Sequence, residues 1–154
     1  MSYVKARECL KKYGLEERII EFPISTATVK LAAEALGSTE GEIAKSMAFY
    51  INDETILIIS AGDKRIDNSK YKQYFKVKAK MVPFEDVESV IGHAAGGVCP
   101  FGINEKVKVY LDESLKKYKY VYPACGTHNT AVKLSIEDLE KASNYDAWID
   151  VCKE

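Results

Sequence analysis

Hydrophobic positions near the start of the chain recur at helical spacing. Apolar side chains stand every three or four positions from Tyr3 to Tyr13, and Gly14 follows them. This pattern predicts an amphipathic helix that ends at the glycine. The same spacing returns over residues 31–36, between Thr28 and Gly37. Because threonine caps helix N-termini and glycine ends helices, we expect a second helix there.

The pattern changes to alternation about one third of the way along the chain. Residues 46–51 and 55–60 are rich in β-forming side chains and are separated by residues 52–54, which predicts a β-hairpin. The sequence KVKAK at 76–80 alternates strictly and predicts a strand whose lysines face solvent. Further strands are expected at 107–111, 118–122, 130–134 and 147–151.

Short helices are expected between these strands. Their start signals are capping residues or a first-turn proline, at Thr39 with Glu42, Asp67, Pro83, and Ser135 with Asp138. About seven short strands and about six short helices in irregular order favour an α+β fold with a mixed, curved sheet over a doubly wound parallel one. No repeat or linker interrupts residues 1–154, so we expect a single domain.

The composition excludes several classes of protein. Apolar residues make up 47% of the 154 residues and charged residues 29%, as in globular proteins. The apolar runs are far shorter than the roughly 18 residues of a membrane-spanning helix, and the charged N-terminus lacks the apolar region of a signal peptide. The four cysteines include no CxxC pair, which favours reduced thiols, a cytoplasmic location and no membrane partner.

Charge is balanced over the whole chain but not locally. Lysine and arginine total 22 against 23 acidic residues, a net charge of −1, which excludes nucleic-acid binding by gross charge. Residues 64–80 are strongly basic, with Asp67 as the single acidic residue. This stretch is either a solvated surface or a patch for RNA phosphates. Its candidate RNA contacts are Lys64, Arg65, Lys76, Lys78 and Lys80.

The most unusual segment is GHAAGGVCPFG at residues 92–102. Glycine lets a ligand approach bare backbone, and successive amide N–H groups in such a turn can bind a phosphate, a carboxylate or a developing oxyanion. An ordinary long connection is the alternative. Lys45 stands between a capped turn and an apolar strand. It is either a rigidly held positive charge or a solvated surface lysine.

Two other candidates involve histidine and cysteine. The turn Gly126-Thr127-His128-Asn129 offers a hydroxyl, an imidazole and an amide, although turn chemistry alone explains its glycine and asparagine. Cys125 and His128 have C-x-x-H spacing, but two histidines and no second close pair disfavour a zinc site. We therefore expect no metal and no cofactor. Cys99 is either a nucleophile, its pKa lowered by nearby amides, or a small loop residue.

Six segments, taken in order, resemble the YbaK/aminoacyl-tRNA synthetase-associated domain family: STATVKLAAEALG, EIAKSMAFYI, ILIISAGDKRID, GHAAGGVCPFGI, VYLDESLKKYKYVYPACGTHN and KLSIEDL. The resemblance extends from about Phe22 to Val151. Members of this family, free-standing or inserted into synthetases, deacylate mischarged tRNA, chiefly tRNA for proline. The resemblance implies a barrel-like mixed sheet flanked by short helices, with the active cleft at one end.

The resemblance also implies roles for particular residues. The family's lysine in the AKS context falls on Lys45, and the threonine that opens the first cleft helix falls on Thr28. Phe22 and the polar turn Gly126, Thr127, His128 and Asn129 are the other implied substrate-binding residues. The GxxxP loop, whose amides would hold the ester carbonyl, falls on Gly96, Gly97, Val98, Cys99 and Pro100.

The implied function is a free-standing trans-editing deacylase of Cys- or Ala-tRNA(Pro). Its partners would be the acceptor end of the charged tRNA and an aminoacyl-tRNA synthetase. The attacking group is left open between water, the terminal ribose hydroxyl and the thiol of a cysteinyl substrate. The alternative is a non-catalytic module that binds an aminoacyl or nucleotide end.

Overall fold

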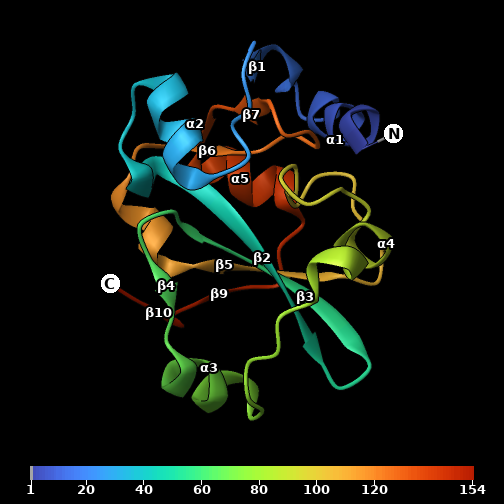
Figure 1. Ribbon diagram of the computed structural model, residues 1–154, viewed down its shortest axis with the longest axis vertical. Coiled ribbons are helices and arrows are strands. Elements are labelled where there is room, and N and C mark those ends of the chain that lie inside the picture. Colours follow the sequence, from blue (N-terminus) through green and yellow to red (C-terminus); the bar gives the residue numbers. More distant parts are fainter. Residues whose placement is uncertain (1) are drawn as a thin grey trace.

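A six-stranded mixed sheet forms the centre of the molecule (Figure 1). The computed structural model describes residues 2–154 and orders the strands β8-β6-β2-β3-β5-β9. The β2–β3 and β6–β8 pairs are antiparallel, whereas β2–β6, β3–β5 and β5–β9 are parallel. The predicted α+β class with a mixed sheet is therefore confirmed. The strands are β2 (Ile43–Ile51), β3 (Glu54–Ala61), β5 (Lys108–Asp112), β6 (Tyr120–Pro123), β8 (Leu134–Ser135) and β9 (Ala147–Ile149).

The predicted hairpin is formed by β2 and β3. Its register runs from Ala44 opposite Ala61 to Ile51 opposite Glu54. Asn52 in the turn has a φ of 54°, a left-handed conformation that asparagine tolerates better than most residues. The hairpin supplies the two longest strands of the sheet, and the pocket described below opens along β2.

Two short antiparallel pairs lie outside this sheet. Strand β1 (Ile19–Glu21) pairs with β7 (Thr130–Val132), and β4 (Arg65–Ile66) pairs with β10 (Cys152–Lys153). A two-residue strand is too short to show alternation in the sequence, so β4 and β10 were not predicted. Their pairing places the end of the described chain beside the segment that follows β3.

Helices α2, α3 and α5 begin at the predicted capping residues Thr28, Asp67 and Ser135. Helix α1 ends at Lys11 rather than at the predicted Gly14, and Pro83 precedes a 3₁₀ turn rather than α4 itself. The side chain of Thr28 accepts a backbone N–H of α2, and Gly37, with φ 68°, ends that helix. Ser135 and Asp138 form the capping box of α5. Within residues 2–154, no helix is both long and apolar enough to span a membrane. The helices are α1 (Ser2–Lys11), α2 (Val29–Leu36), α3 (Asn68–Phe75), α4 (Val87–Ile91) and α5 (Ile136–Ser143), with 3₁₀ turns η1 (Glu16–Arg18), η2 (Glu40–Glu42), η3 (Phe84–Asp86) and η4 (Glu113–Lys117).

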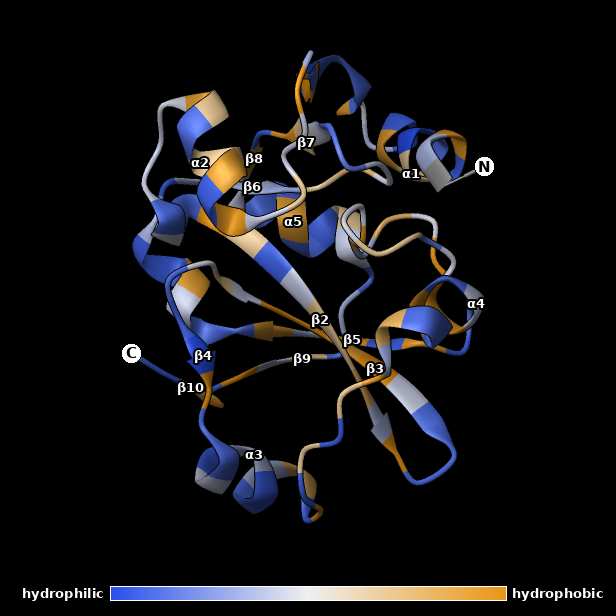
Figure 2. Ribbon diagram, viewed as in Figure 1, coloured by the Kyte–Doolittle hydropathy of each residue, from blue (hydrophilic) through white to orange (hydrophobic). Residues whose placement is uncertain are grey.

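The hairpin separates two hydrophobic cores. Leu57 and Ile59 belong to the larger core, which also contains buried residues of α1 and α5. Phe49 and Ile58, with side chains on the opposite face, pack with Tyr71 of α3 in the smaller core. Figure 2 shows hydrophobic residues along β2 and β3 and mostly hydrophilic residues on α3. In Figure 1, α1 and α2 lie at one end of the molecule and α3 at the other.

The prediction of a strand at KVKAK is wrong. Lys76 adopts a left-handed conformation (φ 68°) that ends α3. The segment reaches β2 only at its end, where the Tyr50 N–H donates to the Lys80 carbonyl oxygen at 2.9 Å. The Val82 N–H then donates to the Ala48 carbonyl oxygen at 3.0 Å. The alternation is still real, because the lysines are exposed and the residues between them are half-buried.

Candidate functional site

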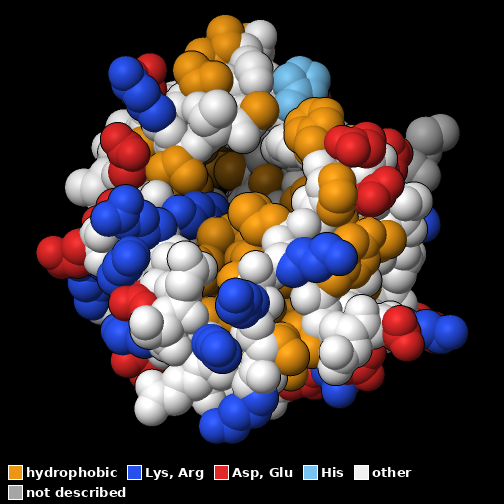
Figure 3. Space-filling model, turned by 60° about the horizontal axis from the view of Figure 1, so that its bottom comes forward, with side chains coloured by type: hydrophobic (Ala, Val, Ile, Leu, Met, Phe, Trp, Pro, Cys, Tyr) orange, Lys and Arg blue, Asp and Glu red, His pale blue; other side chains and the backbone are white. Residues whose placement is uncertain are grey.

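A pocket with a volume of about 230 Å³ opens along one edge of β2. Residues 43–48 of β2 form one wall. The other walls come from residues 26–29 and Ala32 at the start of α2, from the glycine-rich loop (residues 92–102), and from the chain between Met81 and Val87. Strands β6 and β7 and the residue after β6 complete the lining, with Tyr122, Ala124, Thr130 and Ala131. Figure 3 shows a hollow with hydrophobic side chains inside it and Lys and Arg side chains on the surrounding surface. Its size suits a small chemical group rather than a large ligand.

Lys45 is the one charged residue that lines this pocket in the described part of the chain. Its ammonium donates to the carbonyl oxygen of Lys64, just after β3. Burial lowers the pKa of Lys45, and the nearby Cys152 and Asp63 oppose part of that shift. The same pocket is lined by Gly96, so the fold brings the lysine and the glycine-rich loop to one site, with the amine directed at the Lys64 carbonyl.

The backbone of the glycine-rich loop is held by hydrogen bonds on its far side. Gly97 donates to the Ala94 carbonyl at 3.0 Å, and its own carbonyl accepts the N–H of Gly126 at 3.0 Å. A Cβ on Gly97 would lie 2.5 Å from the Thr127 nitrogen, so only glycine fits this approach. Gly96 has a φ of 95°, which also favours glycine. The loop is thus fixed against the Gly126 turn while Gly96 and Val98 line the pocket.

Cys99 and Pro100, expected as part of the same loop site, are instead buried and do not line the pocket. The Cys99 thiol is fully buried and lies 3.5 Å from Nε2 of His93. Burial raises the pKa of Cys99 well above its usual value. This opposes the sequence-based alternative of a reactive thiolate, because a nucleophilic cysteine needs a lowered pKa and access to the substrate.

The polar turn at residues 126–129 supports the pocket wall without lining it. The Thr26 N–H donates to the His128 carbonyl at 2.6 Å. Asn129 Nδ2 donates to the Phe22 carbonyl at 3.0 Å, and the Phe22 N–H donates to the Asn129 carbonyl at 2.8 Å. Of the substrate-binding residues implied by the resemblance, Thr28 lines the pocket, whereas Phe22, Gly126, Thr127, His128 and Asn129 lie behind or beside its wall.

Ser46 is a pocket residue that the sequence reasoning did not identify. It lines the pocket from β2, and its Oγ is buried without a hydrogen-bond partner in the described residues. Its neighbours on the same face of the strand are Ala44 and Ala48. A serine between two alanines on one face of a largely apolar strand is the one sequence signal for it.

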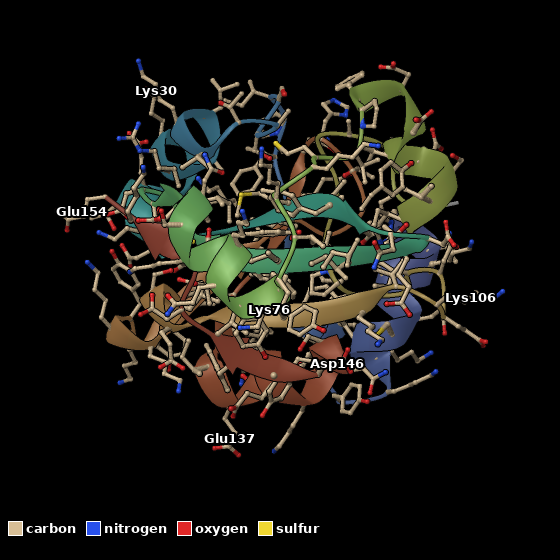
Figure 4. The ribbon with its side chains drawn as sticks, turned by 90° about the horizontal axis from the view of Figure 1, so that it is seen from below. Lys30, Lys76, Lys106, Glu137, Asp146 and Glu154 are labelled. Carbon is tan, nitrogen blue, oxygen red and sulfur yellow. The ribbon has the colours of Figure 1, made fainter. Side chains whose placement is uncertain are left out.

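The basic residues of the 64–80 stretch are divided between two environments. Lys64 is largely buried and pairs with the exposed Glu154 at 3.0 Å. Lys76, Lys78 and Lys80 are exposed on the segment that leads to Met81 at the pocket, and Arg65 is exposed in β4. In Figure 4, Lys106, which lies outside the basic stretch, points outward on the side of the molecule opposite Glu154.

No group of three or more His, Cys, Asp or Glu residues within 2–154 is arranged to hold a metal ion.

The model of the aminoacyl-tRNA editing domain matches residues 24–142, and the chain belongs to this family. It is 44% identical to the uncharacterised protein YwhH of Bacillus subtilis (strain 168), over 100% of this chain and 99% of that protein. It is 27% identical to proline--tRNA ligase of Halalkalibacterium halodurans, over 98% of this chain but 26% of the ligase.

A solved structure of a candidate trans-editing enzyme for prolyl-tRNA synthetase has the same fold. It superimposes with a TM-score of 0.88 at 29% identity, over 99% of this chain and 98% of that chain. The barrel-like editing-domain fold implied by the resemblance is therefore confirmed. The family and these relatives associate the chain with tRNA editing and with prolyl-tRNA synthetases in general.

Proposed function

We propose that this protein is a cytoplasmic deacylase that acts in trans and hydrolyses the ester bond of mischarged aminoacyl-tRNA, with Cys-tRNA(Pro) and Ala-tRNA(Pro) as the substrates to test first. The observation that carries this proposal is the shared pocket of Lys45 and Gly96 in an editing-domain fold. The trans mode is supported by the solved relative, which this chain covers almost completely. The tRNA(Pro) preference is supported by the similarity to proline--tRNA ligases.

The pocket offers two ways to activate an ester. Amide N–H groups of the glycine-rich loop can stabilise the negative charge that develops on the carbonyl oxygen, and such donors typically contribute about 10²–10³ in rate. Lys45 can hold the terminal phosphate or ribose so that the ester lies against the loop. In the net reaction, water adds to the acyl carbon, the bond to the ribose oxygen breaks, and that oxygen takes a proton.

The attacking group is supplied from outside the protein in this proposal. Among the described residues that line the pocket there is no His, Cys, Asp or Glu, so the Ser and Thr hydroxyls of the lining have no imidazole or carboxylate in it to activate them as nucleophiles. The candidates are water, the neighbouring ribose hydroxyl and, for cysteine, the substrate's own thiol. A cysteinyl ester deacylated much faster than an alanyl ester would point to the thiol.

The experiment is a deacylation assay on a panel of tRNAs. Purified protein is mixed with tRNA(Pro) charged with labelled cysteine, alanine, serine or proline, and ester loss is followed over time. We expect rapid loss of at least one of the non-cognate amino acids and stable Pro-tRNA(Pro). A protein that leaves every ester at the uncatalysed rate would contradict the proposal.

A non-catalytic binding module is the second candidate, and the absence of His, Cys, Asp and Glu from the described pocket lining favours it. The same panel separates the two. The binding module predicts saturable binding of charged tRNA without release of amino acid, whereas the deacylase predicts release.

A further inference from the structure

The side of β2 that faces away from β3 has a gap in its backbone hydrogen bonding, and this gap faces the pocket. On this edge β6 pairs with β2 only at Ile43 and Ala44. The segment after Lys80 bonds only to Ala48 and Tyr50. Because peptide groups along a strand point alternately to its two edges, Ser46 is the one residue between these contacts whose N–H and C=O point outward. Neither group has a backbone partner in the described residues.

The hydroxyl of Ser46 is unsatisfied as well. Its Oγ is buried and lacks a hydrogen-bond partner among residues 2–154. Buried polar groups in proteins are nearly always paired. A donor, an acceptor and a hydroxyl without protein partners therefore occur together at one residue of the pocket wall, which indicates a place for polar ligand atoms.

From this gap we infer that the aminoacyl unit of the substrate pairs with Ser46 as a strand of one residue, an inference that rests on the proposed function. An aminoacyl ester carries an amine and a carbonyl on one α-carbon, as one residue of a strand does. In a hydrogen-bonded pair, two residues exchange both of their N–H···O bonds. The substrate amine donates to the Ser46 carbonyl, and the Ser46 N–H donates to the substrate carbonyl oxygen. That oxygen keeps a second lone pair for the glycine-rich loop.

The gap has one hydrogen-bonding position. Three residues of β2 lie between Ala44 and Ala48, a distance of about 13 Å at about 3.3 Å per residue, and only Ser46 among them has outward-facing peptide groups. Protein backbone occupies both ends of the gap, and an acyl group on the substrate amine would extend along β2 towards one of them. The pairing therefore selects a free α-amino group and rejects N-acylated esters such as peptidyl-tRNA, a selectivity that pocket volume alone would not give.

Binding of non-hydrolysable probes tests the pairing. The probes are acceptor-stem minihelices of tRNA(Pro) that end in 3′-amino-3′-deoxyadenosine, linked as an amide to L-alanine, to propionate or to N-acetyl-L-alanine. We expect the alanyl probe to bind wild-type protein about tenfold more tightly than the propionyl probe, the effect of one hydrogen bond to a charged or polar donor. The N-acetylalanyl probe should bind no better than the propionyl probe.

Hydrogen exchange of two neighbouring amides locates the contact. The Met47 N–H points to the other edge, where Met47 lies opposite Ile58 of β3, so it should be protected with or without a probe. The Ser46 N–H should exchange quickly in the free protein and at least tenfold more slowly with the alanyl probe bound. Met47 thus serves as an internal control in the same strand.

Two variants separate the peptide group from the hydroxyl of Ser46. Ser46→Pro removes the outward N–H together with the hydroxyl, without removing a β2–β3 hydrogen bond. The N–H pairs with a carbonyl that both probes carry, so this variant should weaken the alanyl and propionyl probes alike, and more than Ser46→Ala does. The preference for the alanyl probe depends on the Ser46 carbonyl and should remain. Ser46→Ala removes only the hydroxyl, so it should weaken both probes alike and keep their ratio. If the proline variant does not fold, exchange in the wild-type protein still decides the question.

The failures of the two proposals are distinguishable. Equal affinities for the alanyl and propionyl probes, or a Ser46 amide whose exchange is unchanged by the probe, would overturn the pairing and leave the deacylase proposal standing. If the wild-type protein binds none of the probes and deacylates none of the charged tRNAs, the proposed function is wrong and the pairing falls with it.

Discussion

Two polar residues of the central sheet, Asp112 and Ser46, have opposite environments. Asp112, at the end of β5, is 1% exposed, and its carboxylate accepts the N–H of Val151 at 2.9 Å and that of Ser114 at 3.0 Å. Ser46 has a buried hydroxyl without a partner in the described residues. Both residues lie in the same six-stranded sheet, so the difference in hydrogen bonding is local to each residue. The polar atoms of Asp112 have hydrogen-bond partners within the protein, whereas the hydroxyl of Ser46 at the pocket has none among the described residues.

The same contrast applies to charge. The Asp112 carboxylate is stabilised by two backbone donors, whereas the Lys45 ammonium is half-buried and burial lowers its pKa. A group whose charged form is disfavoured by folding reduces stability at neutral pH. Sites that bind ligands commonly carry such costs. Substitutions in the pocket should therefore affect function more than stability, and substitutions in the Asp112 region should do the reverse.

The largest effect is expected at Lys45. We expect Lys45→Met to lower the deacylation rate by about 10²–10³, the usual loss when a preorganised charge or donor is removed. Its melting temperature should equal or exceed that of the wild type, because the variant no longer buries an ammonium. Deacylation kinetics and thermal denaturation measure the two effects. Lys106→Met, an exposed lysine at another side of the molecule (Figure 4), should change neither.

The pH dependence of stability sharpens this prediction. Since the folded-state pKa of Lys45 is lowered, the unfolded chain binds more protons between the lowered and the usual pKa, and wild-type stability rises with pH through that window. The difference from Lys45→Met should therefore shrink as the pH rises towards the usual pKa of lysine. Denaturant titrations over this alkaline range would show it. A difference that grows with pH would contradict the assigned cause.

Asp112→Ala should reverse the balance between stability and activity. It leaves the buried N–H of Val151 and the partly buried N–H of Ser114 without an acceptor. A buried unsatisfied group costs about 1–3 kcal/mol and a partly exposed one less, so we expect a loss of about 2–4 kcal/mol in the free energy of unfolding. The deacylation rate per folded molecule should remain near that of the wild type, because Asp112 does not line the pocket. A large loss of rate in the folded fraction would show that the two regions are coupled.

Charge reversal at Lys76, Lys78 and Lys80 tests whether the pocket extends to an RNA surface. These exposed lysines lead to Met81 at the pocket. We expect the triple glutamate variant to raise KM about tenfold with little change in kcat, and to reduce the salt dependence of binding by about one unit of slope for each phosphate that is no longer neutralised. Lys106→Glu is the matched control. An unchanged salt slope would place the RNA-binding surface elsewhere.

The sequence predicted local features well, because local chemistry determines them. Thr28 and Gly37 bound α2 as expected, and the Ser135–Asp138 capping box begins α5. The strand predicted at KVKAK is wrong because alternation in the sequence does not show whether a partner strand lies within hydrogen-bonding distance. The positive φ of Lys76 then turns the chain away until Lys80 meets β2.

The pocket was predicted in part. The resemblance placed Lys45 and Gly96 together, and both line it. The gap beside Ser46 could not be read from the sequence, because it depends on where β6 leaves β2. Nor could the two sides of the glycine-rich loop be distinguished, although Gly96 faces the pocket and Cys99 the core.

The smallest effect is expected for Cys99→Ser. If the thiol were the nucleophile, this change would abolish activity, but the thiol is buried with a raised pKa, outside the pocket lining. A serine hydroxyl can donate to the Phe101 carbonyl, which the thiol now contacts at 3.8 Å, so we expect a stability change of about 1 kcal/mol or less. The deacylation rate should stay within about twofold of wild type, as for substitutions away from the reacting atoms. A loss of a hundredfold or more, with the melting temperature unchanged, would mean that the loop opens to expose the thiol and that pocket and core are not separate regions here.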